Sequence, residues 1–140
     1  MPYVQIRVSV PLQKEQIEKL AAEAMNSIDL IPGKSAPVTM AEVIDDCNLY
    51  FGTTDGAPCA MVDVMANNSP DPAALKAYSR HMCETLVEVA GIAMNRIYIK
   101  HHGYPEWHTG KMFIEQNKRG TQLLLSASCF IKVPFRSDRS

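Results

Sequence analysis

The sequence lacks an excess of charge, a long apolar run and closely paired cysteines. Its 140 residues include 14 Lys and Arg against 15 Asp and Glu, a formal net charge of -1. This balance gives no electrostatic reason to expect nucleic acid or an anionic membrane as a partner. No apolar stretch approaches the roughly 20 residues that span a bilayer. We therefore expect the partner to be a small molecule or another protein.

The start of the chain shows no targeting pattern. The segment Met1-Pro2-Tyr3-Val4-Gln5 has neither the charged stretch nor the apolar stretch of a signal peptide. A cytoplasmic location is therefore expected, with non-classical secretion left open.

The cysteines are few and scattered, which excludes several kinds of site. No CxxC pair suggests zinc, a redox couple or a disulfide framework, so buried free thiols are predicted. The four residues are Cys47, Cys59, Cys83 and Cys129. The length and the 46% hydrophobic content are typical of one globular domain and exclude disorder.

Hydrophobic periodicity predicts a first strand–helix–strand unit. Alternating apolar and polar residues predict a strand over Tyr3–Val10, and helical spacing predicts a helix from Gln13 to Ser27. Pro32-Gly33 breaks the helical pattern. A second strand is expected over Val38–Asp45.

The next segment predicts a second, similar unit. A strand over Cys59–Ala66 precedes a helix that Asp71 caps, that has Pro72 at its first position and that ends at Gly91. A last strand is predicted over Arg96–His101. The fold class is therefore α/β of the α+β kind, with one four-stranded sheet and two helices on one of its faces.

The strand over Cys59–Ala66 is apolar almost throughout, which is typical of strands that are buried on both faces. Two helices cover only one face of a four-stranded sheet. We therefore expect the second face to meet another subunit.

Pro2 is the first candidate for chemistry, because trimming of Met1 would leave a secondary amine at the start of a strand. An α-amine titrates near 8, and apolar burial or a neighbouring cation favours its neutral form. A neutral amine near pH 7 can take a proton. Taken alone, a proline at position two more often has no function.

Two lysines are further candidates. Lys34 follows a Pro-Gly break where a loop can return toward the first strand, and Lys100 shares one face of the last strand with Tyr98. The simpler interpretation of each lysine is a solvated side chain.

The histidines and two aromatic residues have less specific surroundings. His101, His102 and His108 lack the Cys, Asp or Glu spacing of a metal site, so no metal is expected. Trp107 and Phe113 either anchor the chain to the core or form the wall of an apolar pocket.

Several short motifs stand in a definite order along the chain. They are Met1-Pro2, Gly33-Lys34, Tyr50-Phe51-Gly52-Thr53-Thr54-Asp55, Pro58-Cys59-Ala60, Asn95-Arg96-Ile97-Tyr98-Ile99-Lys100, and Trp107 followed by Phe113. Their order and spacing resemble the macrophage migration inhibitory factor family of the tautomerase superfamily, over roughly Met1 to Phe113.

The resemblance implies a repeated β-α-β unit and a homotrimer with active sites at the subunit boundaries. It implies that Pro2 is the catalytic base and that Lys34 holds the substrate carboxylate or stabilises the enolate oxygen. Tyr98 would come from a neighbouring subunit. Trp107 and Phe113 would form the apolar back wall.

The chain departs from the family pattern at several positions. Lys100 stands where vertebrate cytokine-like members have asparagine, which would add a cation for the substrate, lower the pKa of the amine or alter substrate choice. Asn67, expected to bind substrate, replaces a common isoleucine, and Val38 replaces an aromatic pocket residue. Because Cys59-Ala60-Met61-Val62 lacks a second cysteine, thiol oxidoreductase activity is not carried over.

Family members finish near Phe113, which divides this chain into a tautomerase-like domain, 1–113, and a C-terminal extension, 114–140. The apolar segments Leu123-Leu124-Leu125 and Cys129–Val133 add a strand, pack across a trimer or remain a mobile extension. The residues leave these alternatives open.

The leading hypothesis is a homotrimeric keto-enol tautomerase, an isomerase of the phenylpyruvate tautomerase kind, that acts on 2-keto acids without metal or cofactor. The alternative is a cytokine-like or other protein-binding homologue without significant catalysis. A dehalogenase or decarboxylase of the superfamily ranks lower, because those branches use arginines where this chain has Asn67-Asn68-Ser69-Pro70.

Overall fold

The computed structural model describes residues 1–68, 70–116 and 122–126. The chain divides into two compact units. The first comprises Met1–Met65 and Pro70–His102, and the second comprises Ala66–Ser69 and Gly103–Ser140.

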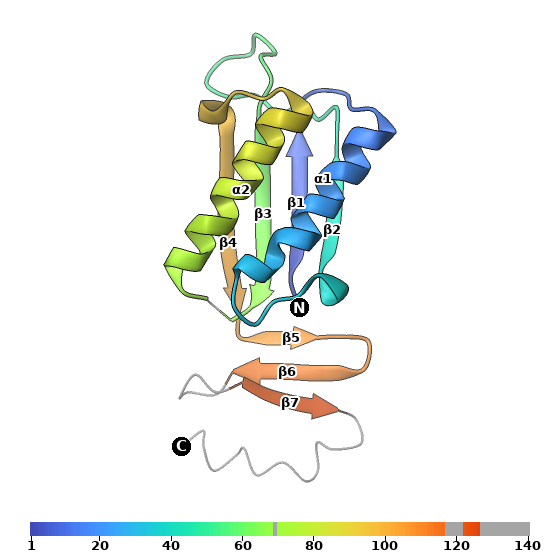
Figure 1. Ribbon diagram of the computed structural model, residues 1–140, viewed down its shortest axis with the longest axis vertical. Helices are drawn as coiled ribbons and strands as arrows, with labels where there is room; N and C mark the ends of the chain where they lie inside the picture. Colours follow the sequence, from blue (N-terminus) through green and yellow to red (C-terminus); the bar gives the residue numbers. More distant parts are fainter. Residues whose placement is uncertain (69, 117–121, 127–140) are drawn as a thin grey trace. The chain divides into compact units, whose positions relative to one another are not determined.

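The first unit is built on a four-stranded mixed sheet in the order β2-β1-β3-β4, with both helices on one face (Figure 1). Strand β1 pairs parallel with β2 and antiparallel with β3, while β3 and β4 run in the same direction in Figure 1. The elements are β1 (Tyr3–Val8), α1 (Lys14–Asn26), β2 (Met40–Ile44), β3 (Ala60–Asn67), α2 (Pro72–Ala90) and β4 (Ile97–Tyr104). This arrangement confirms the predicted α+β fold.

The order and type of these elements were predicted correctly, but some strand boundaries were not. Strand β2 begins at Met40 instead of Val38, because Ala36–Val38 forms a 3-10 turn with a proline in its first residues. The Thr39 hydroxyl donates to the Ser35 carbonyl oxygen across this turn, at 2.7 Å. Further 3-10 turns cover Ser27–Leu30 and Met94–Arg96.

Both predicted ends of α2 are confirmed. The Asp71 carboxylate accepts a hydrogen bond from the Ala73 backbone N–H at 3.3 Å, and Pro72 is the first helical residue. Gly91 ends the helix with a φ of 67°, a left-handed conformation that glycine adopts without a Cβ clash.

The core lies between the helices and the face of the sheet that they cover. Alternate residues of β1 (Val4, Ile6 and Val8) are fully buried against the helices. Tyr78 of α2 is also fully buried, and its hydroxyl donates to the Ala24 carbonyl oxygen of α1 at 2.8 Å. This bond ties the two helices together inside an apolar layer.

The opposite face of the sheet, called here the open face, carries a mixture of charged, aromatic and thioether side chains. Among the described residues, no helix covers it (Figure 1). Its central residue Asp63 is nevertheless buried, while Met61 and Met65 beside it on β3 are half-buried. A subunit contact on this face stays a prediction.

The second unit contains a three-stranded antiparallel sheet in the order β5-β6-β7. Its strands are β5 (Glu106–His108), β6 (Met112–Gln116) and β7 (Gln122–Ser126). The segment 123–125 therefore adds a strand, one of the three alternatives, while Cys129–Val133 lies outside the described residues. The predicted domain boundary at residue 113 falls within β6.

The thiols of the described part of the chain are free. Cys59 is buried as predicted, whereas Cys47 and Cys83 are only half-buried. Cys129 lies outside the described residues. No helix in this part of the chain is long and apolar enough to cross a membrane.

Arg96 holds the loop between β2 and β3. Its guanidinium donates to the carbonyl oxygens of Pro58 at 2.8 Å, Ala57 at 3.2 Å and Phe51 at 3.4 Å. The same group lies over the Phe51 ring, 5.2 Å from the centroid. One side chain thus satisfies three loop carbonyls and positions an aromatic ring.

Replacing Tyr78 with phenylalanine should lower the free energy of unfolding by about 1–2 kcal/mol, because the ring still packs but the hydrogen bond between the helices is lost. Urea denaturation measures this change. Tyr50→Phe, at an exposed position, is the control and should have little effect. Equal stability of wild type and Tyr78→Phe would show that the bond contributes nothing.

Replacing Arg96 with lysine should loosen the loop, because an ammonium cannot reproduce three guanidinium contacts. Hydrogen exchange of the amides in residues 52–57 should become faster, and the free energy of unfolding should fall by about 1–3 kcal/mol. Arg80→Lys, at an exposed helical ion pair, is the control. It should leave these exchange rates unchanged and alter the free energy of unfolding by no more than a few tenths of a kcal/mol. Unchanged exchange in the Arg96 variant would contradict the assigned role.

Candidate functional site

The start of the chain lies beside the loop that follows α1. Pro2 is buried, and its carbonyl oxygen accepts a hydrogen bond from the Met40 backbone N–H at 3.0 Å. Lys34 is half-buried after the Pro32-Gly33 turn, where Gly33 has a φ of 81°. The Lys34 backbone N–H donates to the Ile31 carbonyl oxygen at 3.1 Å.

This environment changes the acid–base behaviour of the N-terminal amine. Burial, and then the nearby Lys34 charge, lower the pKa of the Met1 amine from 8.0 to about 6. Burial also lowers the pKa of Lys34. The structure therefore brings the loop lysine to the chain start, as the sequence predicted, and an amine here is mostly neutral at pH 7. With Met1 present the Pro2 nitrogen belongs to a peptide bond, so the amine is that of Met1.

Tyr98 lies at the other end of the sheet. Strand β1 starts opposite Met65 and ends opposite Ala60, and a cavity of about 370 Å³ lies beside Ala60 at that far end. Its lining residues are Leu49, Tyr50, Phe51, Gly52, Cys59, Ala60, Met61 and Tyr98. Within one protomer, Tyr98 is therefore not brought to Pro2 and Lys34.

Part of the cavity wall is an aromatic pair, Phe51 and Tyr98, of which sequence reasoning singled out only Tyr98 as a binding residue. The rings of Phe51 and Tyr98 meet edge to face with 4.9 Å between centroids, and Tyr98 remains 62% exposed. The sequence offered a signal, because Tyr50 and Phe51 precede the turn-rich segment, but only the fold brings that segment to β4.

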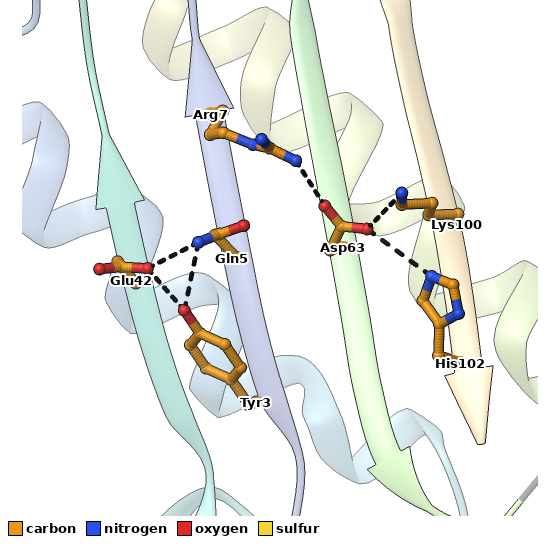
Figure 2. Close-up of polar contacts among 7 residues, drawn as sticks. All are labelled: Tyr3, Gln5, Arg7, Glu42, Asp63, Lys100 and His102. Carbon is orange, nitrogen blue, oxygen red and sulfur yellow. Dashed lines mark hydrogen bonds and ion pairs between the residues drawn. The ribbon is translucent and has the colours of Figure 1, made fainter. Parts of the chain in front are cut away.

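Lys100 lies on the open face of the sheet, two residues beyond Tyr98, as predicted. Its ammonium lies 3.1 Å from Asp63 Oδ1, while Arg7 Nη2 lies 2.8 Å from Asp63 Oδ2 (Figure 2). His102 Nε2 is 3.8 Å from Asp63 Oδ1. These four residues are called here the Asp63 cluster. Of these four, sequence reasoning named Lys100 as a binding residue and His102 only as one of three clustered histidines, although Asp63 is the one charged residue in an apolar strand.

A second polar group lies on the neighbouring part of the open face. Glu42 Oε1 accepts hydrogen bonds from the Tyr3 hydroxyl at 2.5 Å and from Gln5 Nε2 at 2.8 Å (Figure 2). These bonds lower the pKa of Glu42, the Tyr3 bond being the stronger cause. Glu42 and Asp63 both lie opposite Gln5, so the two polar groups of the open face lie side by side across the sheet.

The remaining predicted binding residues occupy other places. Asn67 is the last residue of β3 and is buried, and Val38 is exposed. Trp107 pairs with Ile114, and Phe113 pairs with His108. Because paired residues point to the same side, Trp107 and Phe113 lie on opposite faces of the three-stranded sheet and form no common wall within it.

The histidines do not gather into a metal site. His101 Nε2 lies 2.6 Å from the Ser79 hydroxyl, and burial, then the neighbouring His102, lower the pKa of His101. His108 packs against Phe113, with 6.2 Å between ring centroids. In the described part of the chain, no three His, Cys, Asp or Glu side chains are arranged to hold a metal ion.

Solved structures share this fold. MIF2 of Leishmania major superposes with a TM-score of 0.72 at 23% identity, covering 88% of this chain and 97% of that protein. The Toxoplasma gondii macrophage migration inhibitory factor superposes with a TM-score of 0.68 at 20% identity, covering 77% and 96%. That of Trichinella spiralis gives 0.65 at 16% identity, covering 86% and 99%.

The sequence itself carries the family assignment. No protein with a curated description matches the chain, but the sequence model of the family "Macrophage migration inhibitory factor (MIF)" matches residues 1–114. The match spans both β-α-β units and ends within β6. The chain therefore belongs to the macrophage migration inhibitory factor family, within the tautomerase superfamily.

Proposed function

We propose that this protein is a keto-enol tautomerase that acts on 2-keto acids and uses Pro2 as its base once Met1 has been removed. The observation that carries the proposal is the environment of the chain start, where burial and then the nearby Lys34 charge lower the pKa of the Met1 amine to about 6. After trimming, the Pro2 amine would lie one residue further along the same buried chain start. Such an amine is mostly neutral at pH 7 and can accept a proton without a metal or cofactor.

The proposed reaction moves one proton between oxygen and carbon. The neutral Pro2 amine first takes the proton from the enol hydroxyl, which leaves an enolate and a protonated amine. The oxygen electrons then form the C=O bond while the C=C electron pair takes a proton from the protonated amine onto carbon. The amine is neutral again at the end. Lys34 holds the substrate carboxylate or stabilises the negative charge that develops on the oxygen.

The proposal also includes assembly as a homotrimer. Tyr98 lies at the end of the sheet away from Pro2, so Tyr98 would reach the site only from another subunit. The exposed Tyr98 ring, which packs against Phe51, is available for such a contact. Asn67, Lys100 and one of the two aromatic residues, Trp107 or Phe113, are proposed to complete the pocket in the assembly, because the two aromatic side chains lie on opposite faces of their sheet.

Replacing Pro2 with glycine should reduce phenylpyruvate tautomerisation by a hundredfold or more, because the positioned secondary amine is lost. Intact-mass measurement must first show that Met1 has been removed from both proteins. In a second variant, one alanine is inserted between Met1 and Pro2, which moves the terminal amine one residue away from Pro2. Its tautomerase activity should be reduced to a similar extent. Equal rates for trimmed wild type and Pro2→Gly would refute the assigned base.

Replacing Lys34 with methionine should raise the pKa of the N-terminal amine, because the positive charge that disfavours its protonated form is removed. The acidic limb of the pH–rate profile of kcat/KM should therefore move to higher pH. Lys19→Met, on the exposed side of α1, should leave the limb in place. A Lys34→Met profile that keeps the wild-type limb would mean that Lys34 does not tune the base.

A further inference from the structure

Strand β7 lies beyond the part of the chain that the family model matches. The match ends at residue 114, within β6, whereas β7 covers Gln122–Ser126. Strand β7 pairs antiparallel with β6, so β6 is the central strand of the three-stranded sheet (Figure 1). The proposed function assigns no role to β7.

The hairpin of β5 and β6 is weakly paired on its own. Strand β5 is only three residues long, and an isolated two-stranded hairpin is at best marginally stable in water. Glu106 of β5 lies directly opposite Glu115 of β6, and like charges in this arrangement weaken strand pairing. The Thr109 hydroxyl fixes the turn, because it accepts a hydrogen bond from the Met112 backbone N–H at 3.0 Å. The turn is therefore well defined, but the pairing needs further support.

Strand β7 gives β6 this support along its whole length. Its five residues lie opposite Met112–Gln116. Ile114, in the middle of β6, is 1% exposed and lies opposite Trp107 on one side and Leu124 on the other. A third strand of this kind turns a marginal hairpin into a sheet that holds its shape.

Both candidate wall residues depend on the position of β6. Trp107 and Phe113 are half-buried. The Trp107 ring lies against Tyr104, with 6.2 Å between centroids, and the Phe113 ring lies against His108 at the same separation. Trp107 is paired to β6 through Ile114, and Phe113 belongs to β6 itself. An ordered β6 therefore fixes the orientation of both rings.

We propose that β7 is a positioning strand, which orders the β5–β6 hairpin by pairing with β6 and thereby fixes Trp107 and Phe113. Its consequence for substrate choice rests on the proposed function, which gives one of these aromatic residues to the pocket. A fixed ring binds the aromatic part of a substrate better than a mobile one, because less conformational entropy is lost on binding. Strand β7 thus favours 2-keto acids that carry an aromatic ring.

The first test needs no activity. Leu123→Pro and Leu124→Pro are made separately in the full chain. Adjacent strand residues direct their N–H groups to opposite edges, so one of the two variants loses a hydrogen bond to β6. Trp107 is the only tryptophan, and its emission should shift to longer wavelength in that variant. The amides of residues 112–116 should exchange about tenfold faster or more.

The controls separate a loosened hairpin from general unfolding. Leu124→Ile keeps the N–H and favours a strand, so it should match wild type. Amides of β1 and α2, which belong to the first unit, should keep their exchange rates in the proline variants. If the proline variants do not fold, Leu124→Gly, which weakens a strand without removing an N–H, is measured instead. Wild-type emission and β6 exchange in the folded variants would overturn the inference.

The second test compares phenylpyruvate with oxaloacetate, a 2-keto acid without a ring. In the variant with a loosened β6, the ratio of kcat/KM for phenylpyruvate to that for oxaloacetate should fall by about fivefold or more, mainly through a higher KM for phenylpyruvate. The acidic limb of the pH–rate profile should stay in place, because the N-terminal amine belongs to the first unit. A merely structural role would impair both substrates alike, and an unchanged ratio would overturn the selectivity assigned to β7.

Failure of the proposed function has a different signature. Trimmed wild type would then turn over neither substrate. The emission of Trp107 and the exchange of the β6 amides would still show whether β7 orders the hairpin.

Discussion

The rest of the structure depends on the placement of the N-terminal strand inside the sheet. Strand β1 has β2 on one side and β3 on the other, so the chain start is held by hydrogen bonds instead of fraying. The first amine therefore lies half-buried at the edge of a packed core, beside the loop that returns from α1. A lowered pKa follows from that position before any catalytic argument is made.

The two faces of the sheet divide stability from recognition. The helix-covered face is apolar, and its buried side chains, Tyr78 among them, form the hydrophobic core that stabilises the first unit. The open face holds polar groups in fixed places, because each sits on a strand and is paired across to the next one. A rigid surface of this kind suits binding, since little conformational entropy remains to be lost when a ligand or subunit arrives.

Local signals in the sequence predicted the elements well. The ends of α2 were predicted from Asp71, Pro72 and Gly91, whose capping effects act within a few residues. The strands were predicted from the alternation of apolar and polar residues. The predicted start of β2 was wrong because the apolar residues of the 3-10 turn over Ala36–Val38 continue the apolar pattern of the strand in the sequence. The chain start and Lys34 were paired correctly because a Pro-Gly turn after the helix points the loop back.

The parts of the site that depend on cross-strand pairing could not be predicted from one sequence. Arg7, Asp63 and Lys100 lie far apart along the chain, and only the register of β1, β3 and β4 brings them together. The Phe51–Tyr98 pair depends in the same way on the loop held by Arg96. Trp107 and Phe113 look alike in the sequence, yet the pairing of β5 with β6 sends them to opposite faces.

The central claim is that the chain start of the mature protein carries a neutral amine base at pH 7. The most direct measurement is an NMR titration of the Pro2 nitrogen in protein from which Met1 has been removed, as shown by intact mass. The account predicts a pKa well below 8, the ordinary value of an α-amine. A Pro2 pKa at or above 8, or a chain that retains Met1 in its native source, would contradict it.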